Sequence, residues 1–588
     1  MKVNLKHTVN DIEELLKYRG ISNIEQFKNP DDSMLENPAN LDNIDKAYKS
    51  LKKVISDNPY PKILLLVDSD ADGNTSSAVM WLYLKNHYNI EADWIIHTKK
   101  QHGLEDKIDE LENGDKVYDL LIQADSGSND AEFHKRLYET IGAITIVLDH
   151  HLQDINADEH AIIVNNQMSL NYSNKALSGV GIVWQFCRYI DRMENTNDAA
   201  DYIDLVALGC ISDMMVGTTP ENRFIYWYGL QHLKNKFFRE MVAYQAYSIG
   251  NELTPLGVAF YITPLINGMI RSGEQNEKEM MFQAFIQPET IVSSGKRGHK
   301  GEPVNICEEV VRLCVNARAR QNRLLEKMEE RIDGRIMEHG LLDNKILFVK
   351  LTDEDRDFPS EVNGLLANRL VSKYQRPVML GRENEDGFDR GSIRGVNGSE
   401  LTSFKNFLED SGLMEYVQGH DNAAGWALPS RSENALIDYA NTNLANINFA
   451  EGYYNVDFNY TTSDNELFSN VVDTTNWSDV FGQGNPEPVF YVHNINLTPA
   501  SFTIMGKNKD TVKFLAGGIT FIKFKATNFI KDLADAGSNI CLSIIGRANK
   551  NEYMGRITYQ LFIDDYEING NEINNSIDND DLLAKLAF

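Results

Sequence analysis

The stretch PKILLLV (61–67) runs directly into DSDADG (68–73), and this junction determines how the first half of the chain is expected to fold. A short apolar run that ends in acidic residues is typical of a buried parallel strand. Strands that alternate with helices predict an open α/β sheet, whose ligands bind at the carboxyl ends of the strands. Two similar runs and two intervening helical segments follow: 117–124 (VYDLLIQA), 141–148 (IGAITIVL), 75–87 and 130–140.

Composition limits the classes of protein that the chain can belong to. A length of 588 residues predicts about three or four domains. We find no apolar run long enough for a transmembrane helix, and no secretion signal, so a cytoplasmic protein is expected. None of the five cysteines forms a CxxC pair, which argues against a zinc site or a disulfide framework. The net charge of −29 argues against a general polyanion-coating protein, but it permits a local basic groove.

The second half of the chain changes character three times. Segment 302–337 carries a proline only at its start, Pro303, and is predicted to form one long spacer helix. A second α/β unit follows, with a strand at 345–350 (KILFVK) and a helix from about 361 to 374. Short β-rich stretches broken by Gly, Asn and Pro over 455–570 predict a small barrel.

Carboxylate and imidazole groups gather in four segments, three of which follow predicted strands. Asp68 and Asp70 are two residues apart, so in an extended chain they point to the same face. Carboxylates packed together repel one another unless cations neutralise them, and mixed carboxylate and imidazole ligands suit Mn²⁺ or Mg²⁺. Two such ions could activate a water and stabilise the leaving oxygen of a phosphodiester. The candidates are Asp68 and Asp70 in DSDADG, Asp125 in ADSGS, Asp149-His150-His151, and Asp213 in ALGCISDMM.

Two simpler interpretations could apply to these residues. DSDADG resembles the start of a calcium-binding EF-hand loop, but that loop needs an acid at its twelfth position, where this chain has Val79. A single Asp after a strand is also a common helix N-cap. The second interpretation applies to any one of the residues, whereas the coincidence of four segments favours a shared site.

With these residues the sequence resembles the DHH phosphoesterase family, which is named for the triplet found here at Asp149-His150-His151. Within that family it resembles the RecJ exonucleases. The resemblance covers nearly the whole chain. It rests on LSGVGIVWQF (177–186), DLVALGCISDMMVGTTPENR (204–223), ITPLINGMIRSG (262–273), FPSEVNGLLANRL (358–370), YQRPVML (374–380), GSIRG (391–395), GHDNAAG (419–425), FGQGNPEPVF (481–490) and QLFIDDY (560–566).

This resemblance implies an α/β fold with two α/β domains, DHH and DHHA1, joined by a long helix and followed by a β-barrel OB-fold domain. The implied division is an N-terminal helical segment at 1–60, a DHH catalytic domain at 61–300, a connecting helix at 301–341, a DHHA1 substrate-binding domain at 342–450, an OB domain at 451–570 and an acidic tail at 571–588.

The resemblance also assigns roles to individual residues. Asp149, His150 and His151 would form the catalytic triplet, with His151 contacting the scissile phosphate or completing the metal site. Ser392 and Arg394 would hold a terminal phosphate, a task that suits the forked donors of guanidinium. Arg271 and His420 would line the same cleft. The implied ligands of two Mn²⁺ or Mg²⁺ ions are Asp68, Asp70, Asp125, His150 and Asp213.

Two positions depart from the family pattern. RecJ proteins usually carry a histidine two residues before the first Asp of this motif, where this chain has Leu66. The family also carries an Asn-Arg pair ahead of a Glu-Gly-Tyr-Gly-Leu run, where this chain has HTKKQHGL (97–104). The arginine position falls near His97, so Lys99 or Lys100 would replace its phosphate contact with less geometric selectivity.

The implied function is a 5′→3′ exonuclease that hydrolyses single-stranded DNA to 5′-mononucleotides in recombination and repair, with single-strand-binding protein or a helicase as a partner and a monomeric state. The OB domain would grip the strand by stacking, with at most two of five candidate aromatics taking part. The alternatives are a phosphodiesterase for short oligonucleotides or cyclic dinucleotides and a non-catalytic scaffold, which Leu66 alone favours. The five aromatics are Tyr491, Phe502, Phe514, Phe521 and Phe524.

Overall fold

The computed structural model describes residues 1–98, 101–153, 158–449, 451–553 and 555–569. The chain divides into two compact units, which are described separately. One unit comprises Asn23–Gln321 and Ser478–Pro486, and the other comprises Met1–Ser22, Asn322–Trp477 and Glu487–Phe588. None of the described helices combines the length and apolar character needed to cross a bilayer.

The unit containing Asn23–Gln321 is built around a five-stranded parallel sheet in the order β3-β2-β4-β5-β6. The apolar runs predicted as strands at 61–67, 117–124 and 141–148 become its three central strands. The two strands that sequence reasoning missed are those at the edges, which are only partly buried and therefore lack a continuous apolar run. The strands are β2 Ile63–Val67, β3 Asp93–Ile96, β4 Leu120–Ala124, β5 Ile144–Asp149 and β6 Ala161–Asn165.

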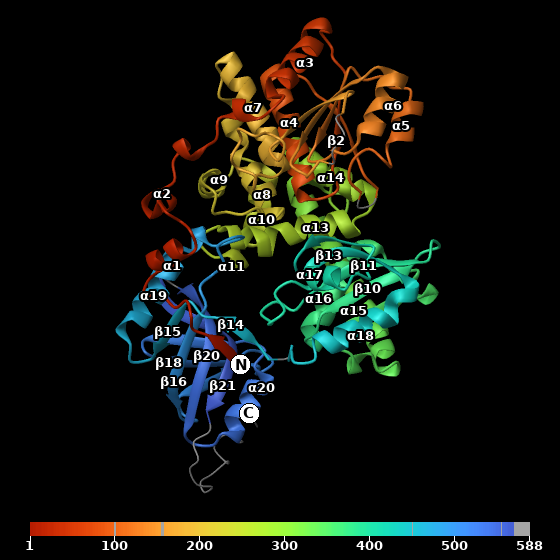
Figure 1. The fold of residues 1–588 in the computed structure, drawn as a ribbon. Helices are drawn as coiled ribbons and strands as arrows, with labels where there is room; N and C mark the ends of the chain where they lie inside the picture. Colours follow the sequence, from red (N-terminus) through yellow and green to blue (C-terminus); the bar gives the residue numbers. More distant parts are fainter. Residues whose placement is uncertain (99–100, 154–157, 450, 554, 570–588) are drawn as a thin grey trace. The chain divides into compact units, whose positions relative to one another are not determined.

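Helices cover both faces of this sheet (Figure 1). Side chains of β2 alternate between two separate cores, one on each face. Leu65 and Val67 pack with the helices α4, Ala71–Tyr88, and α7, Gly179–Glu194. Leu64 and Leu66 pack on the opposite face with α5, Ile108–Asn113, and α6, Ala131–Ile141. This alternation fixes which way each residue at the end of the strand can point.

The same unit contains further helices. They are α2 Ile24–Lys28, α3 Ile44–Asp57, α8 Ile203–Ser212, α9 Pro220–Gln231, α10 Lys236–Tyr244, α11 Ala246–Ile249, α12 Pro255–Gly257, α13 Thr263–Ser272 and α14 Gln275–Ile286. The predicted long helix is α15, Ile306–Glu338, which crosses from this unit into the other. It begins later than the expected 302 because Pro303–Asn305 form the strand β8, which pairs antiparallel with β7, Ile291–Ser293.

The second unit contains a five-stranded sheet in the order β12-β13-β11-β10-β9, in which the predicted strand at 345–350 becomes the edge strand β9. Helix α16, predicted near 361–374, packs on it and has the bounds Asn363–Tyr374. The remaining elements are β9 Leu347–Leu351, β10 Val378–Glu383, β11 Phe388–Arg394, β12 Tyr416–His420, β13 Ala423–Pro429, α17 Phe404–Asp410 and α18 Glu433–Asn443.

The predicted β-rich segment forms a seven-stranded mixed sheet in the order β15-β16-β20-β21-β19-β18-β17. The N-terminus joins this unit through β1, Lys2–Asn4, and α1, Ile12–Tyr18. Strand β1 pairs with β14, Tyr453–Asn455, a partner so distant in sequence that the all-helical expectation for 1–60 missed it. The other elements are β15 Phe458–Thr461, β16 Phe490–Leu497, β17 Phe502–Met505, β18 Thr511–Ala516, β19 Ile519–Lys523, β20 Ile540–Tyr553, β21 Arg556–Asn569, α19 Asn465–Asn476 and α20 Thr527–Asp535.

The expected fold class is confirmed: one α/β unit and a second α/β sheet are connected by a long helix, and a β-rich domain follows. The exact domain bounds stay a prediction. The acidic tail predicted at 571–588 lies outside the described residues.

Candidate active site

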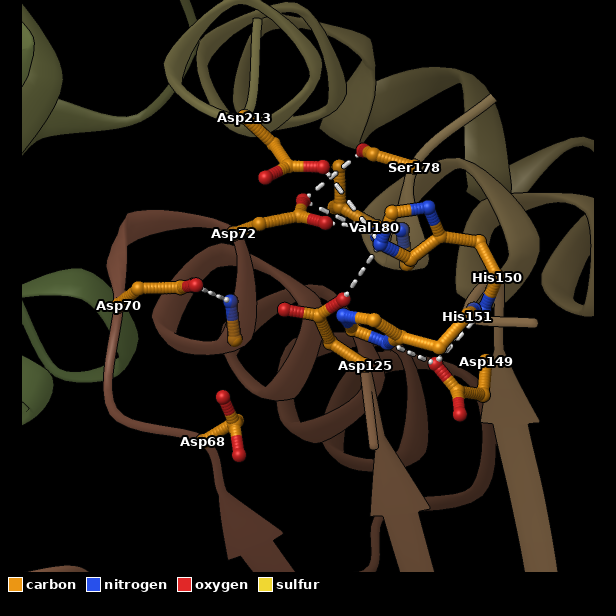
Figure 2. A network of polar contacts seen from close by, with 12 residues as sticks. Asp68, Asp70, Asp72, Asp125, Asp149, His150, His151, Ser178, Val180 and Asp213 are labelled. Carbon is orange, nitrogen blue, oxygen red and sulfur yellow. Dashed lines mark hydrogen bonds and ion pairs between the residues drawn. The ribbon is translucent and has the colours of Figure 1, made fainter. Parts of the chain in front are cut away.

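The acidic residues selected from the sequence lie where regular elements begin or end (Figure 2). Asp68 follows β2, Asp125 follows β4, and Asp149 ends β5. Asp70 is the N-cap of α4, whose side chain accepts a 2.9 Å hydrogen bond from the Gly73 amide. The N-cap interpretation of a single Asp is therefore correct for this residue, which still turns its charge toward the cluster. Because parallel strands end at one edge of the sheet, all of these carboxylates meet there.

Asp125, His150 and Asp213 form what we call the first ligand group. The Nε2 atom of His150 lies 3.3 Å from Asp125 Oδ1 and 3.5 Å from Asp213 Oδ2. Asp213 is the C-cap of α8, so a helix end supplies the third residue. Asp125 has a positive φ of 72°, a backbone conformation that Asp tolerates better than most residues.

Asp149 holds the two histidines of the triplet in place. Its Oδ1 accepts hydrogen bonds from the His150 amide at 2.7 Å and from His151 Nδ1 at 2.8 Å, while Oδ2 accepts from the Ser128 amide at 3.0 Å. Burial alone would raise the pKa of Asp149, but the hydrogen bond and charge of His151 hold it below its usual range. The same bond raises the pKa of His151 to about 9, whereas burial lowers the pKa of His150 to about 4.

Asp68, Asp70 and His102 form the second ligand group. Their ligand atoms all lie within 4.8 Å of one another, and His102 Nδ1 lies 2.6 Å from Asp68 Oδ2. Asp68 is 1% exposed, and burial raises the pKa of its carboxyl. His102 was not among the ligands inferred from the sequence, because it belongs to no regular element and its partner lies 34 residues away.

Asp72 is a second residue that sequence reasoning left out of the site. Its Oδ1 accepts a hydrogen bond from the Ser178 hydroxyl at 3.0 Å, and its Oδ2 accepts from the Gly179 amide at 2.8 Å, so it caps α7. One of its oxygens also lies within 4.8 Å of ligand atoms of His150 and Asp213. Asp68 and Asp70 were selected from the sequence because residues two apart in an extended chain point to the same face. Asp72 lies in the first turn of α4, where that rule does not apply.

The cluster carries more negative charge than its surroundings can neutralise. Burial raises the pKa of Asp125 well above its ordinary value, and the neighbouring carboxylates raise it further. Burial and the charges of Asp72 and Asp70 raise the pKa of Asp213 to about 8, and similar causes raise that of Asp72 to about 7. Among the described residues, no donor is hydrogen-bonded to the buried Asp68 Oδ1 or Asp125 Oδ1. Unsatisfied oxygens, a neutral imidazole and raised pKa values together fit a pair of divalent cations.

Small residues allow the carboxylates to approach so closely. A Cβ atom added to Gly179 would lie 2.3 Å from Asp125 Oδ1, and one added to Gly73 would lie 2.4 Å from Asp68 Cβ. A Cβ added to Gly209 would lie 2.6 Å from Asp72 Oδ1. A larger residue at any of these three positions would displace a carboxylate of the cluster, which explains why glycine stands there.

Three cationic residues of this unit were predicted to contact the substrate. Arg271 lies near the end of α13, where burial lowers the pKa of its guanidinium and the charge of Asp70 opposes that shift. Arg271 is therefore within electrostatic range of Asp70, a member of the second ligand group. The other predicted substrate contacts, Lys99 and Lys100, lie outside the described residues.

Ser392, Arg394 and His420 belong to the second unit and form a separate group there. Arg394 and His420 both pair with Ala423, so the side chains of Arg394, Ala423 and His420 occupy one row across the sheet. Ser392 pairs with Gly425 two positions along and therefore points to the same face. Helix α16 contributes Gly364, where a Cβ would lie 2.4 Å from Arg394 Nη2.

In the seven-stranded sheet, three of the five candidate stacking aromatics belong to the core. Phe502, Phe514 and Phe521 are buried, while Phe524 is exposed and Tyr491 is partly exposed.

Known proteins resemble this chain in both sequence and structure. Residues 62–210 match the model of the DHH family, N-terminal domain, and residues 459–565 match that of the RecJ OB domain. The chain is 35% identical over 568 residues to YorK, an SPbeta prophage-derived protein of Bacillus subtilis (strain 168) that is named as a single-strand DNA-specific exonuclease. That similarity covers 94% of this chain and 95% of YorK.

More distant similarity extends to proteins named RecJ. The single-stranded-DNA-specific exonuclease RecJ of Bacillus subtilis is 25% identical over 579 residues, covering 94% of this chain and 67% of that protein. The fold is similar to that of RecJ from Thermus thermophilus, solved in complex with Mn²⁺, with a TM-score of 0.70 at 19% identity. The match covers 96% of this chain and 79% of that structure.

Proposed function

Because this chain belongs to the RecJ family of single-strand DNA-specific exonucleases, we propose that it hydrolyses single-stranded DNA from the 5′ end to 5′-mononucleotides, using two divalent cations. The observation that supports the proposal most strongly is the geometry of the first ligand group, in which His150 Nε2 lies within 3.5 Å of both Asp125 and Asp213. Carboxylate-rich sites with one imidazole favour Mn²⁺ over Mg²⁺.

We assign the cation ligands to Asp68, Asp70, Asp125, His150 and Asp213, with Asp72 as an additional contributor. Bound there, the cations would lower the pKa of an attacking water and stabilise the leaving oxygen. The low pKa of His150 keeps its ring neutral, which leaves a nitrogen lone pair available to a cation. Two ligand atoms that each lie about 2.1 Å from one ion can be no more than about 4.2 Å apart. The ligand atoms of Asp68, Asp70 and His102 lie within 4.8 Å of one another, so a small inward shift would bring them within reach of one ion.

His151 is assigned a different role from His150. Its raised pKa, which Asp149 causes, keeps the ring protonated at neutral pH. A protonated imidazole beside the carboxylate cluster can donate a charge-assisted hydrogen bond to a non-bridging oxygen of the scissile phosphate. Asp149 then acts as the residue that positions His151 and holds its proton, since its oxygens are already engaged by His150, His151 and Ser128.

Cationic and polar groups outside the ligand set would orient the strand. Arg271, within electrostatic range of Asp70, would bind a backbone phosphate through its forked donors. The row formed by Arg394 and His420, with Ser392 on the same face, would bind the 5′-terminal phosphate, and the small residues Ala423 and Gly425 between them leave room for it. We also retain Lys99 and Lys100 as phosphate contacts on the basis of the family resemblance alone.

The family relationship extends the proposal beyond the reaction. We propose a cytoplasmic, monomeric enzyme of DNA recombination and repair, working with single-strand-binding protein or a helicase. Tyr491 and Phe524 are the two candidates left to stack on bases in the OB domain, because the other three aromatics are buried. The domain division inferred from the sequence, with DHH at 61–300, DHHA1 at 342–450 and OB at 451–570, belongs to the same proposal.

The test is a digestion of long single-stranded DNA with Mn²⁺, comparing the wild type with Asp213→Ala. Linear DNA should yield 5′-mononucleotides, whereas circular single strands and blunt duplexes should remain intact. Asp213→Ala should abolish the reaction while leaving the fold unchanged by circular dichroism. In the same assay a 5′-phosphate should be preferred to a 5′-hydroxyl, and Arg394→Ala should remove that preference. Cleavage of circular DNA, or no cleavage by the wild type at all, would contradict the proposal.

A further inference from the structure

Leu66 occupies a position that cannot supply a metal ligand. It lies on β2, is 0% exposed, and packs against the core that contains Leu104 and Ile108. The histidine that the family resemblance leads one to expect at this position is therefore replaced by a purely structural residue. If the second ligand group holds a cation, its imidazole must come from elsewhere.

His102 supplies an imidazole to this group from a different part of the chain. The segment that carries it is fixed on both sides. Before it, the Gln101 amide donates a 2.8 Å hydrogen bond to the hydroxyl of Ser69, the residue next to Asp68. After it, the Leu104 amide donates a 2.9 Å bond to Asp130 Oδ2, and the Leu104 side chain is fully buried. His102 is thus held against Asp68 by anchors that do not involve its own ring.

A separate observation indicates that a small ligand belongs beside Asp68. Its buried Oδ1 atom faces His97 Nε2 at 4.0 Å, and neither atom has a hydrogen-bond partner among the described residues. The other ring nitrogen of His97, Nδ1, lies 2.7 Å from Asp106 Oδ1, an arrangement that orients a histidine toward a cation.

A small cavity lies beside these two residues. Asp68 and His97 line a cavity of about 20 Å³, enough for one water molecule or ion. Lys278 also lines it, but its ammonium group donates to the Thr98 carbonyl at 2.9 Å.

We propose that His102 is the imidazole ligand of the cation held by Asp68 and Asp70, replacing the ligand that is absent at position 66, and that His97 faces this cation from the buried side. The proposal rests on the two-cation function proposed above. It assigns Nδ1 as the coordinating atom of His102, because that atom faces Asp68, and it places the ring proton on Nε2.

Mn²⁺ binding, measured by electron paramagnetic resonance without any DNA, tests the proposal. The wild type should bind two Mn²⁺ ions per chain. His102→Ala should weaken the binding of one ion by about tenfold or more and leave the other unchanged. His299→Ala is the matched control, because His299 is similarly exposed and its Nδ1 also pairs with a carboxylate, that of Glu302 at 2.9 Å. This control should bind both ions as the wild type does.

Pulsed resonance on the bound Mn²⁺ provides a second readout, since it detects nitrogen nuclei that coordinate the ion. The wild type should show the signals of coordinated histidine nitrogens, His102→Ala should lose the contribution of His102, and His150→Ala should lose that of His150. If the wild type binds no Mn²⁺, the proposed function itself fails. If the wild type binds two ions and His102→Ala retains both affinities and both nitrogen signals, the function stands and this inference is wrong.

Discussion

The first and second ligand groups lie at the same edge of one sheet but are built in different ways. The first takes its residues from the ends of β4, β5 and α8, elements whose positions the fold determines. The second combines the end of β2 and the start of α4 with His102, which belongs to no helix or strand. Ligands at the ends of regular elements are tied to the topology, whereas a ligand on an anchored loop can replace one that the sheet has lost.

Asp125→Asn should give the largest effect, because Asp125 interacts with carboxylates of both groups. Asn keeps the shape of the side chain and tolerates the positive φ, so the fold should survive. We expect both Mn²⁺ ions to bind weakly and kcat/KM on single-stranded DNA to fall by about a thousandfold or more.

The control for this change is Asp201→Asn, which alters an exposed acid paired with Lys234. Asp201→Asn should leave both the binding of Mn²⁺ and kcat/KM on single-stranded DNA unchanged. Retention of near wild-type activity by Asp125→Asn would mean that the two groups do not share this residue.

Gly179→Ala perturbs the first group most directly. The added methyl would lie 2.3 Å from Asp125 Oδ1, so the carboxylate must move. Displacement of a reacting group by about 1 Å can cost about a hundredfold in rate, and we expect a loss of that size in kcat. The affinity for the Mn²⁺ ion at the second ligand group, which contains His102, should fall less than the affinity for the ion at the first group.

Gly334→Ala is the matched control for the glycine, since it also lies in a helix and a Cβ there meets nothing within 4 Å. It should keep full activity and be slightly stabilised. Equal behaviour of the two variants in the nuclease assay would show that close packing at Gly179 is irrelevant to the reaction.

The smallest effect concerns pH. The pKa values of Asp72 and Asp213 are raised to about 7 and about 8, so in the cation-free protein these groups remain protonated up to neutral pH. In the unfolded chain they ionise near pH 4. Their contribution to stability is thus fully present below that value, decreases progressively as the pH rises, and is lost once the pH has passed 7 to 8.

Cation binding must displace these protons, so Mn²⁺ affinity should increase between pH 6 and 8, by at most about tenfold per pH unit for each proton released. Calorimetry in buffers of different ionisation enthalpy measures the number of protons directly. An affinity that is independent of pH would show that Asp72 and Asp213 are already ionised without cations.

Much of this arrangement could be predicted from the sequence, because buried parallel strands leave a strong apolar signal. The runs ahead of Asp68, Asp125 and Asp149 indicated three neighbouring strand ends, and topology then brought the acids together. Edge strands β3 and β6 were missed because half-buried strands lack such runs. The roles assigned to the site residues stay predictions, whereas their proximity is a feature of the structure.

The remainder of the site depends on contacts that sequence spacing does not reveal. Asp72 acquires its position from Ser178 and Gly179, more than one hundred residues away. His102 depends on the anchoring of Gln101 and Leu104, and it can be recognised only after Asp68 has been located in space. A lone histidine in a polar stretch carries no periodic signal of its own.

The cap that Asp72 places on α7 couples the charge of the cluster to the rigidity of a core helix. Any cation that draws on this carboxylate also alters how firmly the first turn of α7 is closed, because the Gly179 and Val180 amides depend on the same two oxygens. The exchange rates of these two buried amide hydrogens should therefore report metal occupancy from within the protein interior, in the absence of any nucleic acid. Hydrogen exchange in the first turn of α7 would then show whether cations are bound at the site.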